Sequence, residues 1–175
     1  MAAASTDADT VRILNYPALF RYSFPETIIT IRNPAPHIGD RMANYALTYG
    51  FRPEMELRYQ ADCDDVLNDT YKSSRLYALK INELRKKYAE QLLRGEFRDT
   101  DELAAIPKGL TATSFVNGDT MAAVLWNDTN EAIDLKSFAA KSPWKLKEAA
   151  SVSQTTKKLP VTIAAGELLV ALFAK

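Results

Sequence analysis

The stretch from residue 26 to residue 94 most constrains the fold, because its pattern predicts two strands that are each followed by a helix. Strand, helix, strand, helix is the repeating unit of parallel α/β folds. Two such units can neither close a barrel nor build a sheet that is covered on both faces. We therefore expect this 175-residue chain to be the end of a larger fold. The predicted order is a strand at 26–32, a loop at 33–39, a helix at 40–49, a strand at 53–59, a second loop and a long helix at 71–94.

The first predicted strand is rich in β-branched residues and lies between Pro25 and Pro34. Its apolar residues do not alternate strictly, which is typical of a parallel strand that is covered on both faces. The loop that follows contains two prolines and Gly39, a composition typical of turns. Asp40 is a good N-cap for the next helix. The predicted apolar stripe of that helix is Met42, Tyr45, Ala46 and Tyr49.

The long helix is marked by its caps and by the spacing of its apolar residues. Asn68, Asp69 and Thr70 all suit a helix start, and Gly95 suits a helix stop. The apolar residues between them recur at spacings of four, three, four and four, which keeps them on one helical face. They are Tyr77, Ile81, Leu84, Tyr88 and Leu92.

After residue 107 the sequence changes from helical to strand-like patterns. Asn117-Gly118 lies between apolar runs at 113–116 and 121–126, and Asn-Gly is a strong hairpin signal because both residues accept a positive φ. Further short apolar runs separated by turn signals predict a small antiparallel β-sandwich. We expect a flexible lead-in at 1–10, a partial (β/α) barrel segment with a long terminal helix at 11–107, and a β-sandwich domain at 108–175.

Composition excludes several classes of function. Lys and Arg number 22, as do Asp and Glu, so no overall charge draws the chain to nucleic acid or to an anionic membrane. The single cysteine, Cys63, can form no internal disulfide. The sequence contains no phosphate-binding loop, dinucleotide fingerprint or zinc pattern, so we expect no cofactor and no metal. It also contains no apolar run near the ~20 residues that span a bilayer, and its start lacks the segments of a signal peptide.

Candidate site residues follow from topology alone. In a parallel (β/α)8 barrel, functional groups lie at the carboxyl ends of the strands and in the loops that follow. This rule selects Arg32, Asn33, His37, Arg58 and Asp62 as candidate rim residues that contact substrate. None of them is assigned a catalytic role, because no pair of carboxylates can be placed across a cleft, as glycoside chemistry requires.

Each candidate also has a structural alternative. His37 can be a loop residue that backbone groups or water satisfy, and the two arginines can hold neighbouring loops through backbone carbonyl groups. Asp62 can stabilise the N-terminus of the following helix through the helix dipole. Trp126 and Trp144 can stack on sugar rings, or they can belong to the core or to an inter-domain contact.

Several stretches of the chain resemble a known group of proteins. They are residues 19–33, 44–59, 81–88 and 95–99. These stretches look like the C-terminal part of bacterial glycoside-hydrolase-like proteins, of the kind common in carbohydrate loci of gut Bacteroidetes. The resemblance covers residues ~15–175. It implies an α/β part followed by an all-β part, namely the last two βα units of a TIM-type barrel and a C-terminal antiparallel β-sandwich. It also implies carbohydrate as the ligand, and a parent protein that is periplasmic or secreted.

The resemblance also implies that most of the barrel is absent, including the earlier strands on which related glycosidases place their acid/base and nucleophile. The first hypothesis is therefore the C-terminal portion of a carbohydrate-active enzyme, inactive alone. The alternative is a non-catalytic carbohydrate-binding or structural accessory module. An unfinished parallel sheet exposes backbone edges and apolar faces. We therefore expect the missing half of the barrel, or a second copy of the chain, as a partner, and a more autonomous β-region after residue 108.

Overall fold

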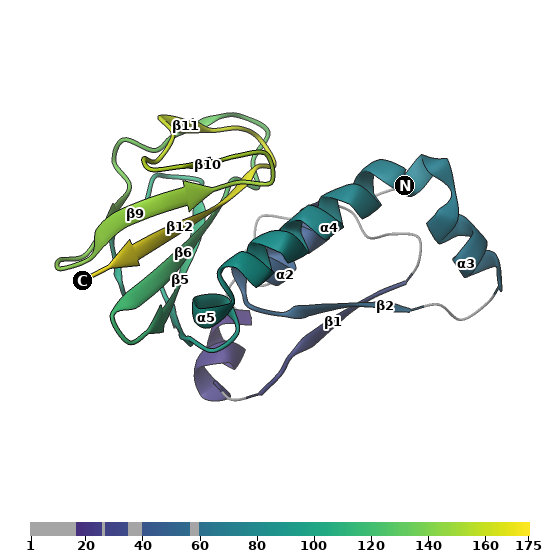
Figure 1. Ribbon diagram of the computed structural model, residues 1–175, viewed down its shortest axis with the longest axis horizontal. Helices are drawn as coiled ribbons and strands as arrows, with labels where there is room; N and C mark the ends of the chain where they lie inside the picture. The colour runs from purple at the N-terminus through teal and green to yellow at the C-terminus, as the bar shows by residue number, and fades with distance from the viewer. Residues whose placement is uncertain (1–16, 26, 35–39, 57–59) are drawn as a thin grey trace.

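The computed structural model describes residues 17–25, 27–34, 40–56 and 60–175 (Figure 1). A helix at residues 17–23 precedes the first strand. The helical half then contains β1 (Thr30–Pro34), α2 (Asp40–Thr48), β2 (Arg52–Glu56), α3 (Gln60–Leu67), a 3-10 turn η1 (Asp69–Tyr71), α4 (Lys72–Lys87) and α5 (Ala89–Leu92). The β half contains β3 (Glu96–Asp99), β4 (Leu103–Ala105), β5 (Thr111–Asn117), β6 (Thr120–Trp126), β7 (Ile133–Asp134), β8 (Ala139–Ala140), β9 (Lys145–Ala150), β10 (Thr155–Thr156), β11 (Thr162–Ile163) and β12 (Leu168–Ala174).

A six-stranded antiparallel sheet organises the molecule, with the strand order β10-β9-β12-β6-β5-β3. At its centre β6 pairs with β5 on one side and with β12 on the other. The predicted hairpin is confirmed, because Asn117 and Thr120 close the β5–β6 ladder around Gly118, whose φ is +57°. Two further sheets, β4-β8 and β11-β7, have two strands each. The chain therefore ends in a β-rich region that is mostly antiparallel.

The central strands of this sheet are buried on both faces, which explains their continuous apolar sequence. Alternate residues of β6 belong to two different cores: Ala122, Val124 and Trp126 to the first, and Met121, Ala123 and Leu125 to the second. β12 alternates in the same way, with Leu168 and Val170 in the first core and Leu169 and Ala171 in the second. The six-stranded sheet is therefore the middle layer of three.

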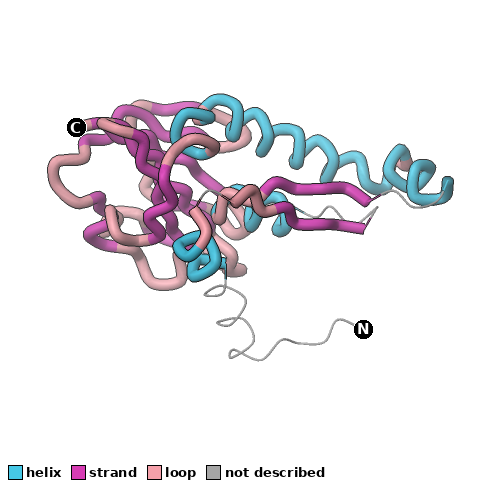
Figure 2. The backbone as a smooth tube through the Cα atoms, turned by 90° about the horizontal axis from the view of Figure 1, so that it is seen from below, coloured by secondary structure: helices cyan, strands magenta, loops and turns pink. Residues whose placement is uncertain are grey.

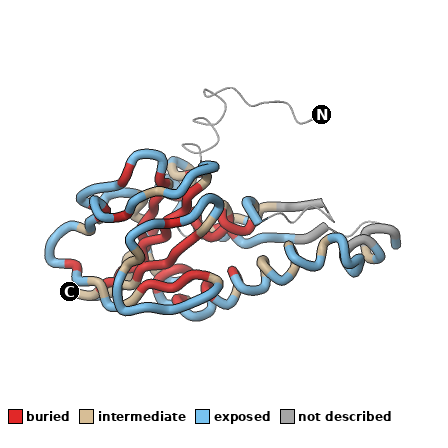
Figure 3. Tube along the Cα trace, turned by 90° about the horizontal axis from the view of Figure 1, so that it is seen from above, coloured by how far each residue is buried: buried red, intermediate tan, exposed pale blue. Residues whose placement is uncertain are grey.

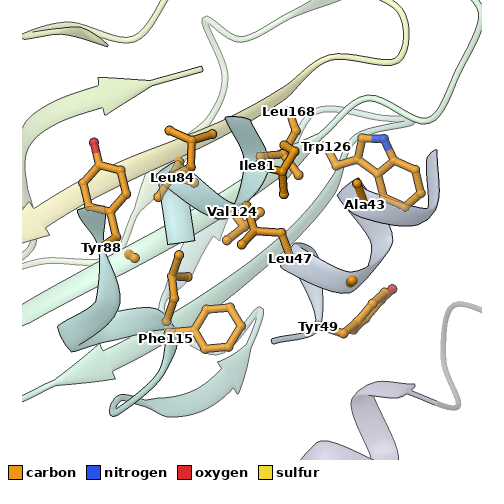
Figure 4. Close-up of a cluster of buried hydrophobic side chains, with 14 of the residues drawn as sticks. Ala43, Leu47, Tyr49, Ile81, Leu84, Tyr88, Phe115, Val124, Trp126 and Leu168 are labelled. Atoms are coloured by element: carbon orange, nitrogen blue, oxygen red, sulfur yellow. The ribbon is translucent and has the colours of Figure 1, made fainter. Parts of the chain in front are cut away.

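The first core joins the helices to the sheet (Figure 4). The helices contribute Ala43 and Leu47 from α2 and Ile81 and Leu84 from α4, while the sheet contributes Phe115, Val124 and Leu168. Because one core contains residues of both halves, removing either half would expose apolar surface of the other. The helical half and the sheet are thus coupled in stability.

The second core lies on the opposite face of the sheet. Leu103 of β4 and Ile163 of β11 belong to it, together with Leu135 and Phe138 from the segment between β7 and β8. The two small sheets therefore cover the face that the helices leave free. A sandwich of two complete sheets stays a prediction, because the second face has two separate two-stranded sheets.

The far end of the helical half extends away from the sheet. α3, the start of α4 and the strands β1 and β2 project beyond the β half in two views (Figures 1 and 2). Buried residues gather around the sheet, whereas this projecting part is mostly exposed (Figure 3). Large apolar side chains are exposed in the helical half, among them Ile28, Leu67, Leu76 and Leu79 at 62%, 76%, 50% and 60%. The described residues thus leave apolar surface of the helical half uncovered.

Four local predictions differ from the structure. The expected loop between the second strand and the long helix contains α3 (Gln60–Leu67). The predicted helix 71–94 is broken at Tyr88 (φ −107°, ψ 33°), where α4 ends and α5 begins. The break lets Tyr88 donate a hydrogen bond from its hydroxyl to Glu148 of β9 at 2.9 Å. The first strand is β1 at 30–34 rather than 26–32, because its parallel pairing with β2 fixes its bounds. Strands also begin before residue 107, since β3 already pairs with β5.

Candidate functional site at the carboxyl ends of β1 and β2

β1 and β2 form a parallel pair, so their carboxyl ends meet at one edge of a two-stranded sheet. The register runs from Thr30 opposite Arg52 to Pro34 opposite Glu56. α2 connects the two strands, as the sequence predicts. The residues at this edge are Pro34, which ends β1, and Glu56, which ends β2. In a parallel barrel this is the edge at which functional groups lie.

The predicted site residues fall partly inside the strands. Arg32 and Asn33 are both in β1, where Arg32 lies opposite Glu54 and Asn33 opposite Met55. Asp62 lies in the first turn of α3. His37 and Arg58 lie outside the described residues. The backbone thus brings Arg32 and Asn33 toward the expected edge, and the contact of these five residues with substrate stays a prediction.

A cavity of about 330 Å³ opens beside the N-terminal turn of α2, which follows the loop after β1. We call it the α2 cavity. Asp40, Arg41 and Asn44 of α2 line it, with Tyr77 of α4, Trp126 of β6 and the turn at 165–167. Residues from the helical half and from the β half therefore share one concave surface.

A bidentate ion pair closes one side of this cavity. Arg41 donates from Nε to Oδ1 of Asp128 at 2.8 Å and from Nη2 to Oδ2 at 2.6 Å. These charge-assisted hydrogen bonds raise the pKa of the Arg41 guanidinium. The Arg41 guanidinium also lies 6.0 Å from the centre of the Trp126 ring. The pair therefore fixes the start of α2 against the end of β6.

A second hydrogen-bond network holds the middle of α2. Asn44 is 1% exposed, and its Nδ2 donates to the backbone oxygen of Gly166 at 2.9 Å. Its Oδ1 accepts from the hydroxyl of Tyr77 at 2.7 Å. Burial raises the pKa of Tyr77; the hydrogen bond to Asn44 opposes this rise, and the charges of Asp40 and Glu167 add to it. Tyr77 therefore stays a neutral hydrogen-bond donor at neutral pH.

Two carboxylates remain at the wall of the α2 cavity. Among the described residues, Asp40 and Glu167 form no ion pair, and Glu167 accepts a hydrogen bond from the backbone nitrogen of Ala164 at 3.1 Å. Carboxylates of this kind accept hydrogen bonds from the hydroxyl groups of a ligand. In the part of the chain that is described, no group of three or more His, Cys, Asp or Glu residues is arranged to hold a metal ion.

The two tryptophans belong to the interior. Trp126 is 1% exposed, and Trp144 is 9% exposed. The indole nitrogen of Trp144 donates to Glu102 at 2.7 Å, and the ammonium of Lys175 lies 4.8 Å from the centre of its ring. Neither ring presents a free face to a sugar, so the core interpretation is confirmed for both.

The sequence did not indicate the residues that build the α2 cavity. Of the stripe predicted for α2, Ala46 and Tyr49 are buried and Met42 and Tyr45 are partly buried, but the helix also buries Ala43, Asn44, Leu47 and Thr48. The error arises because Asn44 is polar and yet faces the core, where its partners come from α4 and from the turn at 165–167. The one sequence signal for this network is Asn44, a polar residue on the helix face that also carries the apolar residues 43, 46 and 47.

No known protein family and no curated protein sequence matches the chain. Solved structures do. The α-amylase from Geobacillus thermoleovorans, complexed with acarbose, is 15% identical over 94% of this chain and 43% of that chain, with a TM-score of 0.54. An α-amylase from Anoxybacillus is 15% identical over 77% of this chain and 32% of that chain, with a TM-score of 0.42. The trehalose-6-phosphate hydrolase of Bacillus licheniformis is 20% identical over 71% of this chain and 23% of that chain, with a TM-score of 0.40.

The likeness to the Geobacillus enzyme concerns the fold, because only 15% of the residues are identical. The chain spans less than half the length of each of these glycoside hydrolases. No described helix is long and apolar enough to cross a membrane. The chain thus shares the fold of a part of a glycoside hydrolase of the α-amylase kind.

Proposed function

We propose that this chain is the C-terminal portion of a carbohydrate-active, glycoside-hydrolase-like protein and is inactive alone. In this proposal β1 and β2 are the last two strands of a (β/α)8 barrel, and the β half is its C-terminal sandwich domain. The catalytic groups lie on strands outside this chain. The same proposal includes the group of proteins that the sequence resembles, namely the glycoside-hydrolase-like proteins common in carbohydrate loci of gut Bacteroidetes.

The observation that carries the proposal is the open β1–β2 pair. Neither outer edge of the pair has a strand neighbour among the residues that the structure describes. Parallel strands occur almost only in sheets that are covered on both faces, and a two-stranded sheet is marginally stable at best. A preceding run of six βα units, whose end strands pair with the two outer edges, would complete the pair into a (β/α)8 barrel.

The fold likeness supports the same proposal. The Geobacillus α-amylase matches 94% of this chain while the chain matches 43% of it, as expected for one portion of a larger protein. That enzyme was solved in complex with acarbose, and we propose carbohydrate as the ligand of the complete protein here. Arg32, Asn33, His37, Arg58 and Asp62 would then contact substrate from the edge where β1 and β2 end.

The alternative, a non-catalytic carbohydrate-binding module, loses its two predicted sugar contacts. Trp126 and Trp144 are 1% and 9% exposed, so neither can stack on a sugar ring without unfolding its surroundings. A module of this kind would have to bind glycan through another surface.

Turnover of aryl glycosides by the purified 175-residue chain tests the proposal. We expect no release of nitrophenol from α- or β-linked substrates above the uncatalysed rate. Turnover that is lost in the Asp62→Asn or Arg58→Gln variant would overturn the proposal, because the activity would then reside in this chain. Comparing these variants with the natural chain separates true activity from that of a contaminating hydrolase.

A further inference from the structure

A second cavity of about 330 Å³ lies at the opposite end of the β1–β2 pair. Thr27 and Ile28, which precede β1, line it together with Arg52, the first residue of β2. Arg21, from the helix at 17–23, and Arg94, which follows α5, also line it. We call it the arginine cavity. It lies away from the carboxyl edge, so it is independent of the proposed function above.

The positive charge in this cavity is only partly neutralised. Arg94 pairs with Glu90 at 2.6 Å, and Glu96 at the cavity wall pairs with Arg98 at 2.9 Å. Arg21 and Arg52 make no ion pair within the described ranges of the chain. Two of the arginines that line the cavity therefore have no carboxylate partner among the described residues.

Arg21 is the stronger indication, because it is buried. It is 9% exposed, and its Nε has no hydrogen-bond partner among the described residues. Its Nη1 donates to the backbone oxygen of Thr27 at 3.2 Å, and its guanidinium lies 5.8 Å from the centre of the Phe97 ring. These contacts orient the side chain but supply no negative charge. A buried cation without an anionic partner is costly, and a bound anion would offset that cost.

Arg85 of α4 adds to the positive field. It is 8% exposed, and its Nη2 has no hydrogen-bond partner in the described structure. Burial, and then the positive charge of Arg52, lower its pKa to about 10. The positive charge of Arg52 therefore acts both on the cavity that it lines and on the buried guanidinium of Arg85. Like charges held this close repel one another, and an anion beside Arg52 would reduce the repulsion.

We propose that the arginine cavity binds a small oxyanion, a phosphate or a carboxylate group, through Arg21 and Arg52. The planar fork of a guanidinium matches both groups, since each offers paired oxygens to two parallel N–H donors. The volume of about 330 Å³ accommodates a single phosphate or the carboxylate end of a sugar acid.

Isothermal titration of the full 175-residue chain tests this site. The probes are inorganic phosphate and glucuronate, in a sodium chloride background, with glucose as the uncharged control. We expect at least one oxyanion to bind at a single site and glucose not to bind. Tighter binding of inorganic phosphate would indicate a phosphate ligand, and tighter binding of glucuronate would indicate a carboxylate ligand. Absence of binding by both would overturn the proposal.

Variants locate the binding. Arg52→Gln, at an exposed position, is expected to weaken oxyanion binding about tenfold, because a hydrogen bond to a charged group is lost. Arg21→Lys keeps the charge but loses the fork, and is expected to weaken binding as well. The matched control is Arg94→Gln, which lines the same cavity but pairs with Glu90. An equal loss in the Arg94 variant would contradict the site, because binding would then follow surface charge alone.

Discussion

At the scale of single residues, Gly50 holds the turn between α2 and β2 at φ +68°. A Cβ atom at this position would lie 3.0 Å from Cε1 of Phe115, whose side chain is fully buried. Gly50→Ala therefore adds a steric clash to the strain of a left-handed backbone. We expect it to lower the free energy of unfolding by about 2–4 kcal/mol, measured by urea denaturation.

Gly118 provides the matched control, because its φ is +57° and no atom lies within 4 Å of the position of a Cβ. Gly118→Ala is expected to cost only the backbone strain, about 1–2 kcal/mol. Equal losses in the two variants would contradict the close approach of Gly50 to Phe115.

The buried amide of Asn44 is a second test at this scale. Asn44→Ala leaves the Tyr77 hydroxyl and the Gly166 carbonyl without their partners. We expect a loss of about 1–3 kcal/mol in the free energy of unfolding. Tyr77→Phe in the Asn44→Ala background should then cost little further, because the hydroxyl has already lost its partner. Full additivity of the two changes, in a double-mutant cycle, would speak against the network.

At the scale of elements, Glu148 of β9 joins the sheet to the end of α4. It accepts hydrogen bonds from the hydroxyl of Tyr88 and pairs with Lys87 at 2.9 Å. The bond from Lys87, and then that from Tyr88, lower the pKa of Glu148 below its ordinary value of 4.5. A lowered carboxyl pKa stabilises the folded state above the unfolded pKa, and that contribution is lost as the pH falls through the folded pKa.

Glu148→Gln is therefore expected to destabilise the chain by about 0.5–1 kcal/mol at pH 7, a small value because both partners are partly exposed. At pH 3, which lies below the ordinary carboxyl pKa of 4.5, more of the natural glutamate carries a proton than at pH 7, so the difference between the two chains should shrink. Urea denaturation of both at the two pH values measures this. A difference that is unchanged at pH 3 would show that packing, and not charge, explains the loss.

Elements that depend on local signals were predictable from the sequence. The β5–β6 hairpin follows from Asn117 and Gly118, and the start of α2 follows from Asp40. The elements set by distant partners were not. The break at Tyr88 depends on Glu148, and β3 is a strand because Phe97 pairs with Phe115. The α2 cavity was missed for the same reason, since Arg41 finds its partner Asp128 across the sequence.

At the scale of the whole molecule, the shared first core predicts one cooperative unit. Leu47 of α2 is 1% exposed and packs in the same core as sheet residues such as Val124. Leu47→Ala is expected to cost about 2–5 kcal/mol. The unfolding midpoint measured by the helical signal in circular dichroism should fall, and the midpoint measured by the tryptophan fluorescence of the β half should fall with it. Fluorescence that keeps its original midpoint would instead support the autonomous β-region that the sequence suggests.

We propose above all that this chain belongs to a larger protein whose further strands complete the β1–β2 pair. The most direct measurement is the mass of the natural protein in the cells that encode it, detected with an antibody against this chain. We expect a polypeptide far heavier than the 19.5 kDa of this sequence, large enough for the remaining βα units of a barrel. A single species of 19.5 kDa would contradict it.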